Sequence, residues 1–170
     1  MKNILTICIS LLFLYSCIEV ENKETPNLSE RRAEIDTLIN NWHNDAANGN
    51  LENYFAFMDS ISIYIGTDAS EIWTKEEFYK FCEPYFKKET TWDFKAIERN
   101  IYLSKTNEVA WFDETLNTHM GTCRGSGVLE KTNTEWKLKH YALSVAIPND
   151  DMRAIIDIKS VNDSIFLSQY

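Results

Sequence analysis

The fold is decided by three segments of the sequence: VAWFDETL at 109–116, GTCRGSGVLE at 121–130 and WKLKHYALSV at 136–145. Polar residues suited to turns separate these segments, and the short KTNTE stretch between the second and the third can close a hairpin. We therefore predict three consecutive antiparallel strands, of which the last two are direct neighbours.

The third segment indicates which side of this sheet is buried. Lys137 and Lys139 alternate with Trp136, Leu138 and His140, and successive side chains of a strand point to opposite faces. We expect one face to pack on a core and the other to lie nearer solvent. On this alternation His140 belongs to the core side, in a partly apolar setting.

The order and spacing of these segments resemble the SnoaL-like domain of the nuclear transport factor 2 (NTF2-like) superfamily. The resemblance extends from Leu28 to Asn149 and includes an amphipathic N-terminal helix, IGTD at 65–68 and Trp73. It is carried by AWFDE (110–114), RGSGVLEK (124–131), WKL (136–138), HY (140–141), LS (143–144) and PN (148–149).

The resemblance implies an α+β fold shaped like a cone, in which a curved antiparallel sheet wraps around N-terminal helices and leaves a pocket at the wide end. Members of the superfamily include cyclases, isomerases, dehydratases and non-catalytic binding modules. Because one fold carries all of these, function has to be argued from the residues of the pocket.

Residues 1–16 have the character of a signal peptide of the lipoprotein type. Lys2 supplies the positive charge, and the apolar run over 4–15 is too short for a confident membrane span. The sequence LYSC at 14–17 resembles a bacterial lipobox, in which Cys17 is lipidated and becomes the new N-terminus. The alternative is an ordinary secretion signal with Cys17 as an unmodified thiol. We expect the lipoprotein, anchored to the bacterial cell envelope and either periplasmic or surface-exposed.

The rest of the 170-residue chain divides into three parts. Residues 17–27 are polar and acidic, which predicts a flexible tether. Residues 28–149 form the SnoaL-like domain, which is long enough for one core, and residues 150–170 form a C-terminal extension that is partly helical. The formal net charge of −9 argues against nucleic acid as a partner. The membrane would be held by the acyl chains on Cys17.

Five further elements are expected around the central segments, each from a periodic apolar pattern or a capping pair. They are a helix beginning near Asn27, a short helix over 51–57, a strand over 62–65, a helix beginning at Thr74 and a final helix after Pro148.

Two cysteines, Cys82 and Cys123, remain within the domain. An oxidising compartment would permit a disulfide between them. Cysteines on different elements are more often separate buried side chains, so we expect unpaired thiols.

The sequence contains no glycine-rich phosphate loop after a strand, no Cys-x-x-Cys, no His-Glu-x-x-His and no Gly-x-Ser-x-Gly elbow. His43, His119 and His140 lie on three separate predicted elements without the spacing of metal ligands, so we predict no metal and no cofactor. The family often carries a second histidine two residues after His140, where this chain has Ala142. The glycines at 125 and 127 mark a bulge or a close approach to the backbone.

Asp113, Arg124 and His140 are the candidates for chemistry. A carboxylate beside Trp111 can have a raised pKa and act as a general base, and Arg124 can hold an anionic group. The structural alternative is an ion pair between Asp113 and Arg124 across adjacent strands. Aromatic side chains can line a pocket for an apolar ligand or simply form the core. The predicted ligand-binding residues are Tyr64, Trp73, Trp111, Asp113, Arg124 and His140.

Three functions are compatible with these residues. The first is a membrane-anchored module that binds a small molecule, apolar or of mixed polarity, in the pocket. The second is a cofactor-independent isomerase, dehydratase or cyclase that uses Asp113 or His140 as its acid or base, and it requires those two side chains to reach one cavity. The third is an interaction module in which two copies pair through the outer face of the sheet as a homodimer.

Overall fold

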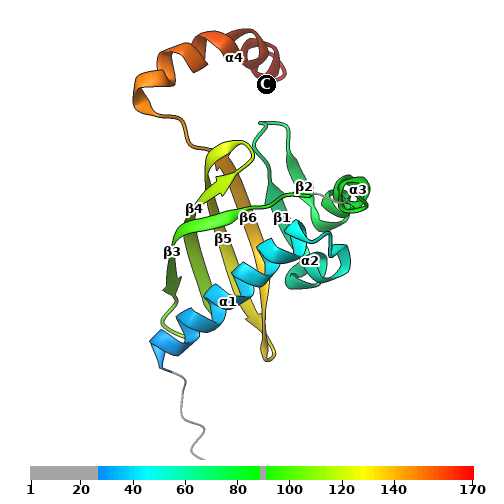
Figure 1. Ribbon diagram of the computed structural model, residues 1–170, viewed down its shortest axis with the longest axis vertical. Coiled ribbons are helices and arrows are strands. Elements are labelled where there is room, and N and C mark those ends of the chain that lie inside the picture. Colours follow the sequence, from blue (N-terminus) through cyan, green and yellow to red (C-terminus); the bar gives the residue numbers. More distant parts are fainter. Residues whose placement is uncertain (1–26, 89–90) are drawn as a thin grey trace, which may run out of the picture.

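A computed structural model describes residues 27–88 and 91–170 of the chain (Figure 1). The predictions for residues 1–26, which include the signal peptide, Cys17 and the tether up to Pro26, lie outside the described residues.

The described chain is an α+β fold with a curved sheet, as the sequence predicted, and the sheet has six strands. The helices are α1 (Leu28–Ala47), α2 (Leu51–Phe57), α3 (Lys75–Phe86) and α4 (Met152–Leu167), with a 3-10 turn η1 (Asn149–Asp151) before α4. The strands are β1 (Met58–Ile65), β2 (Ile72–Thr74), β3 (Lys95–Leu103), β4 (Val109–Thr118), β5 (Gly121–Thr132) and β6 (Glu135–Val145).

The strands are ordered β2-β1-β6-β5-β4-β3 across the sheet. Neighbouring strands are antiparallel, except that β1 and β6 run parallel. The three strands that decide the fold, β4, β5 and β6, pair consecutively, and the prediction made from their alternating pattern is confirmed.

Helix α1 lies across one face of the sheet, while α2 and α3 lie beside β1 and β2 (Figure 1). Asn27 and Glu30 form the predicted capping box at the start of α1. The buried stripe of the helix includes Ile35, Ile39 and Trp42, which pack against the sheet as one hydrophobic core. The helix is followed by Gly49, whose φ of +69° suits a glycine and lets the chain turn into α2.

The strands present one set of side chains to the helices, on what we call the inner face, and the other set to solvent, on the outer face. In β4 the residues Ala110, Phe112, Glu114 and Leu116 are all buried, whereas the residues between them are partly or largely exposed. Paired residues on neighbouring antiparallel strands share a face. The inner face can therefore be followed from β4 through β5 to β6 by the strand register.

Strand β6 changes its alternation at a β-bulge. Trp136 and Leu138 are buried, but the register with β5 shifts before His140, and beyond the shift Tyr141 and Leu143 are the buried residues. The extra residue reverses the alternation and turns His140 to the outer face. The expectation that His140 shares the core side with Trp136 and Leu138 is therefore wrong.

Two glycines of β5 provide space on the inner face. A Cβ atom on Gly127 would lie 2.5 Å from the ring of Phe112, and one on Gly125 would lie 2.2 Å from the hydroxyl of Tyr141. Both distances are shorter than any real Cβ contact, so the two large side chains occupy the space that β5 leaves free. The close approach predicted for these glycines is made by side chains of β4 and β6.

Cys82 and Cys123 are both buried and form no disulfide, as expected. Burial raises the pKa of the Cys82 thiol, so this group stays protonated at neutral pH. Both cysteines act as small apolar residues of the core.

The C-terminal extension forms η1 and α4, and α4 stands away from the sheet (Figure 1). No residue of α4 is buried, and Ile158, Val161 and Ile165 are largely exposed. Its second half and the loop that joins β1 to β2 together line a depression of about 650 Å³. No helix within residues 27–88 and 91–170 has both the length and the apolar character needed to cross a membrane.

Candidate functional site

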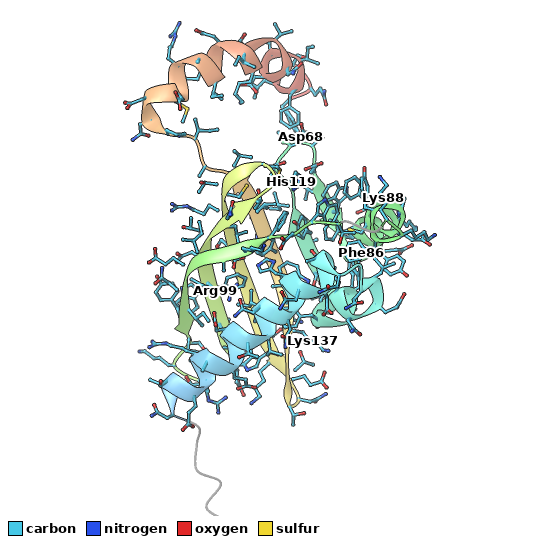
Figure 2. The ribbon with its side chains drawn as sticks, in the orientation of Figure 1. Asp68, Phe86, Lys88, Arg99, His119 and Lys137 are labelled. Atoms are coloured by element: carbon cyan, nitrogen blue, oxygen red, sulfur yellow. The ribbon has the colours of Figure 1, made fainter. Side chains whose placement is uncertain are left out.

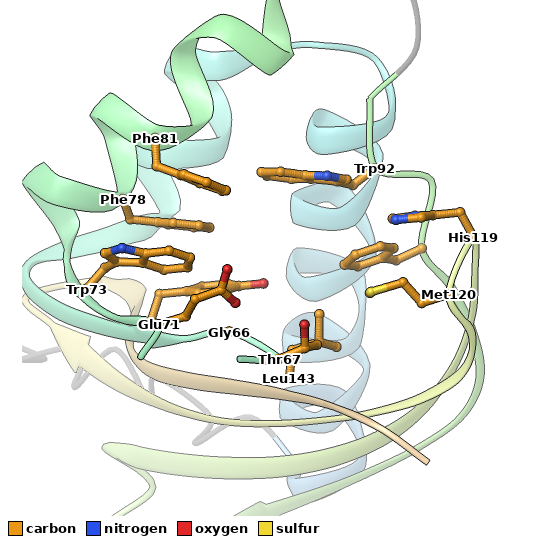
Figure 3. A pocket seen from close by; sticks show the side chains of 12 residues that line it. Gly66, Thr67, Glu71, Trp73, Phe78, Phe81, Trp92, His119, Met120 and Leu143 are labelled. Atoms are coloured by element: carbon orange, nitrogen blue, oxygen red, sulfur yellow. The ribbon is translucent and has the colours of Figure 1, made fainter. Parts of the chain in front are cut away.

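The best-formed cavity lies between the loop that joins β1 to β2, helix α3 and the turn between β4 and β5 (Figure 3). Its volume is about 130 Å³. Most of the side chains around it are aromatic or otherwise apolar. The residues that line it are Tyr64, Gly66, Thr67, Glu71, Trp73, Phe78, Phe81, Trp92, Phe94, His119, Met120 and Leu143.

One wall of the pocket is a series of nearly parallel aromatic rings. The rings of Tyr64 and Phe78 stack with centroids 3.8 Å apart, and those of Trp73 and Phe81 stack at 4.8 Å. Phe78 and Phe81 are one turn apart on α3, and the capping box of Thr74 with Glu77 sets where that helix begins. All residues of this wall come from one continuous part of the chain, because β1, β2 and α3 follow one another without a long loop.

The opposite wall comes from distant parts of the chain. Trp92 and Phe94 precede β3, while His119 and Met120 form the turn between β4 and β5. The Thr118 hydroxyl accepts a hydrogen bond from the Met120 amide at 3.0 Å, which fixes this turn. Figure 2 shows His119 and Asp68 at the end of the sheet nearest α4.

A short loop places Glu71 at the pocket. The Gly66 amide donates to the Glu71 carbonyl at 2.9 Å, and the Asp68 amide donates to the Glu71 carboxylate at 3.1 Å. Asp68 in turn accepts from the amide of Ser70 at 2.9 Å. Figure 3 shows the Glu71 carboxylate pointing into the space between the ring wall and Trp92.

A second group of polar residues lies on the inner face of the sheet, outside the set that lines the pocket. The carboxylate of Glu114 is fully buried and lies 2.9 Å from His43 Nε2 of α1. It also accepts hydrogen bonds from Arg99 Nε at 2.9 Å and from the Tyr141 hydroxyl at 2.8 Å. Arg99 Nη2 adds an ion pair at 2.7 Å, and Arg99 Nη1 reaches Asp36 on α1 at 2.6 Å. We call Glu114, His43, Arg99 and Tyr141 the buried network.

The charge of Glu114 is maintained by its partners. Burial on its own would raise the pKa of this carboxyl, but His43 and Arg99 outweigh that effect and hold its pKa below the usual range. Burial raises the pKa of Tyr141, and the nearby Glu114 carboxylate raises it further, so the phenol remains a donor. The network is therefore a charged centre inside the fold that is stabilised by direct contacts.

Two of the six predicted ligand-binding residues line the pocket. Tyr64 and Trp73 lie in the ring wall as expected. The other four, Trp111, Asp113, Arg124 and His140, project from the outer face of the sheet.

The placement of these four residues corrects the sequence-based assignment. Trp111 and Asp113 alternate in β4 with the buried Phe112 and Glu114, so they lie on the side away from the pocket. Arg124 pairs with Thr115 and Ser144 in the register, on the same outer face. Asp113 accepts a hydrogen bond from the Asn100 amide group at 3.1 Å, and within the described residues it forms no ion pair with Arg124. The predicted cross-strand ion pair is therefore not observed among the described residues.

The residues that the sequence reasoning did not select fall into two sets. Glu71, Phe78, Phe81, Phe94 and Met120 line the pocket, while Glu114 and Arg99 belong to the buried network. A signal for Glu114 was present, because it shares its alternation with Phe112 and Leu116. No group of three potential metal ligands occurs within the part of the chain that the structure describes.

Comparison with known proteins identifies the family. The model of the SnoaL-like domain matches residues 35–148. The chain belongs to the SnoaL-like domain family. Among curated proteins, none is significantly similar in sequence to this chain.

Solved structures show the same NTF2-like fold at low sequence identity. A candidate dehydratase of the NTF2-like family from Streptomyces avermitilis superposes with a TM-score of 0.62 at 10% identity, covering 72% of this chain and 100% of that one. An NTF2-like protein of unknown function from Pseudomonas putida gives 0.61 at 11% identity, with 71% and 90% covered. The association domain of CaMKII from C. elegans gives 0.58 at 14% identity, with 69% and 97% covered. At these identities the similarity shows the fold alone.

The buried network makes a prediction about stability. Glu114→Gln keeps the shape of the side chain but leaves His43 without a carboxylate and Arg99 with Asp36 as its only one, so we expect a loss of about 3–5 kcal/mol in the free energy of unfolding at pH 7. Urea denaturation of the variant and the wild type measures this loss. Glu98→Gln makes the same change of charge at an exposed position of β3, and we expect it to shift stability by less than about 0.5 kcal/mol.

The effect of Glu114 also has a definite dependence on pH. Because its pKa is lower in the folded protein than the ordinary value of 4.5, its contribution is fully present above pH 4.5 and is lost as the pH falls through the folded pKa. The stability difference between wild type and Glu114→Gln should therefore shrink with acidification over that range. A difference that stays constant would show that this carboxyl does not change its ionisation as expected.

Proposed function

We propose that this SnoaL-like domain binds a small, largely apolar molecule in the pocket of about 130 Å³. The observation that carries the proposal is a preformed cavity walled by stacked aromatic rings. An apolar cavity of about 150 Å³ in another protein is large enough to bind benzene. The pocket therefore suits a molecule, or one end of a molecule, about as large as a single aromatic ring.

The chemistry of the walls supports binding of apolar groups. Aromatic rings contribute large apolar contact areas and lose little conformational freedom on binding. Polar side chains are in the minority, and Glu71 is the only carboxylic acid among the residues that line the pocket. Ligand sites commonly combine such an apolar lining with one or two polar groups that fix orientation.

The geometry favours binding over the catalytic alternative that uses Asp113 or His140. Both side chains lie on the outer face, so neither reaches a molecule held in the pocket. Two structural neighbours are a candidate dehydratase from Streptomyces avermitilis and a candidate ketosteroid isomerase from Parabacteroides distasonis. Their names are compatible with a small-molecule ligand for this chain. The two residues of this chain that the catalytic alternative requires, Asp113 and His140, lie outside the pocket.

A binding experiment tests the proposed pocket. Met120→Trp adds volume at the pocket wall and should abolish the stabilisation of the protein by small aromatic molecules such as phenol or indole. For the wild type, a ligand at 100 times its Kd adds about 2.7 kcal/mol to the free energy of unfolding. Thermal unfolding with and without each molecule measures the effect.

The control variant for this experiment is Met152→Trp, which makes the same change on the exposed start of α4. It should respond to the ligands like the wild type. If no small aromatic or aliphatic molecule raises the melting temperature of the wild type, the pocket is not a ligand site and the proposal fails.

We propose further that the domain is held at the bacterial cell envelope by lipid on Cys17. The support is the lipobox-like sequence LYSC at 14–17, followed by an acidic segment that ends at the start of α1. The acidic chain has little charge attraction to anionic lipids. Acyl chains contribute about 0.8 kcal/mol for each buried methylene, so two or more chains suffice as an anchor.

Cys17→Ala should release the protein from the membrane while the domain remains folded. Lipidation requires the thiol, whereas the first helix begins only at Leu28. Cell fractionation measures the release, and circular dichroism of the soluble variant measures the fold. A variant that stays with the membrane after its signal peptide has been removed would assign the anchor to another segment.

The outer face of the sheet favours a second function, which is self-association. Tyr102 and Trp111 stack there with ring centroids 5.8 Å apart and are 41% and 45% exposed. Trp111 of β4 pairs with Val128 of β5, which pairs with His140 of β6, which in turn pairs with Ile63 of β1. These four residues form one row across the outer face of the sheet. Exposed apolar patches of this kind commonly mark protein interfaces. We propose that a second copy of the chain covers this row, and the CaMKII association domain, which has the same fold, is compatible with such a role.

Light scattering tests self-association. The wild type should be a dimer, and Trp111→Lys should be a monomer, because the lysine would place a charge in the centre of the interface. Val161→Lys introduces the same charge at an exposed position of α4 and should leave the dimer intact. A wild-type protein that is monomeric at high concentration would contradict this function.

A further inference from the structure

The Glu71 carboxylate lies in an aromatic pocket without a positive partner. Among the described residues, no lysine or arginine forms an ion pair with it, and none lines the cavity. One carboxylate oxygen, Oε2, accepts the Asp68 amide, whereas Oε1 accepts no hydrogen bond from residues 27–88 or 91–170. The pocket therefore carries a negative charge that the surrounding chain does not neutralise.

The neighbouring groups do not remove this charge. Burial raises the pKa of the Tyr64 hydroxyl, and the negative charge of Glu71 adds to that increase, so Tyr64 remains neutral. Thr67 is neutral, and His119 is exposed at the opposite side of the pocket (Figure 3). A ligand with a positive charge would be attracted by the Glu71 carboxylate.

The aromatic rings also favour a cation. The face of an indole or benzene ring carries partial negative charge, and tryptophan attracts cations most strongly. Figure 3 shows the Glu71 carboxylate on one side of the pocket space and the ring of Trp92 across it, with Trp73 and Phe81 alongside. A positive group in this space would contact the ring of Trp92 and the Glu71 carboxylate, whereas Trp73 and Phe81 are stacked on each other and form an apolar side wall.

Hydrogen-bonding capacity decides which kind of cation fits. A primary ammonium has three N–H donors that need acceptors when they are buried. Besides the Glu71 carboxylate, the side-chain oxygens at the pocket are the Tyr64 and Thr67 hydroxyls, so a primary ammonium would be satisfied only by reaching all three groups at once. A fully methylated ammonium needs no hydrogen bonds and has an apolar surface that suits the rings. An inorganic cation needs several oxygen ligands, and Glu71 is the only carboxylate at the cavity.

We propose that the pocket recognises an organic cation with a quaternary ammonium group, held by Glu71 as counter-ion and by the ring of Trp92, with the stacked rings of Trp73 and Phe81 as an apolar side wall. This inference rests on the proposed function, because it names the chemical class of the ligand for the same pocket. The cavity of about 130 Å³ is large enough for the charged head of such a molecule, and the rest would extend through the open side.

The experiment compares two probes of equal shape, choline and 3,3-dimethylbutan-1-ol, in which a carbon atom replaces the charged nitrogen. Binding to the full chain in a maltoside detergent is followed by tryptophan fluorescence, since Trp73 and Trp92 line the site. We expect choline to bind at least ten times more tightly than the neutral probe. Added salt should weaken the binding of choline only.

Variants connect this preference to Glu71. Glu71→Gln should reduce the preference for choline over the neutral probe at least tenfold. Glu98→Gln makes the same change in net charge at an exposed position of β3 and should preserve the preference for choline. Gly66→Ala keeps every charge, but its new Cβ would lie 2.2 Å from Glu71 Oε2 and displace the carboxylate, so it should also reduce the preference.

The results separate this inference from the proposed function. If both probes bind equally well to the wild type, the pocket is a ligand site but the inference of a cationic ligand is overturned. The same conclusion holds if the preference survives in both Glu71→Gln and Gly66→Ala. If neither choline nor the neutral probe binds while phenol or indole does, the inference fails and the proposed function stands. If no molecule binds, both fail. Comparing the probes on the wild type remains decisive even if a variant does not fold.

Discussion

One buried carboxylate connects the helical layer of this fold to its sheet. Glu114 of β4 contacts His43 of α1, Arg99 of β3 and Tyr141 of β6. An ionised carboxylate without partners in such a dry position would be strongly unfavourable, so the charge requires all three contacts at once. These contacts restrict how α1 can lie across the sheet. The position of the helix is set by directional bonds as well as by packing.

The pocket depends on this arrangement through the rings between it and the buried network. The ring centroids of Tyr64 and Tyr141 are 5.5 Å apart, and those of Phe94 and His43 are 6.2 Å apart. Tyr64 and Phe94 thus face the cavity on one side and the network on the other. Because protein interiors are closely packed, a shift of α1 would be transmitted to the cavity walls. The polar interior and the apolar pocket are therefore parts of one packed unit.

The sequence was sufficient for the fold class and the three central strands, but not for the parallel pairing of β1 with β6 or for the site. The alternation in β4 to β6 and the short turn between the last two strands identified the fold. The prediction that His140 lies on the core side failed because a bulge adds one residue to β6. No feature of the Lys-Leu-Lys-His sequence predicts this bulge. Asp113 was preferred to Glu114 although the two must lie on opposite faces and Glu114 shares its alternation with the apolar Phe112 and Leu116. The wall formed by Trp92, Phe94 and Met120 arises from tertiary contacts between distant segments, which local patterns do not record.

The parallel pairing of β1 with β6 has a consequence for the order of folding. Tyr64 of β1 pairs with Tyr141 of β6. Strand β1 can therefore form this pairing only after β6, the last strand of the sheet, has been synthesised. Pairings between residues so distant in sequence form slowly, because a long loop must be closed before the contact is made. Leu143 of β6 is also part of the cavity wall. During synthesis the chain can therefore complete this cavity only after almost the whole domain has left the ribosome, so an intact cavity marks a domain that has finished folding.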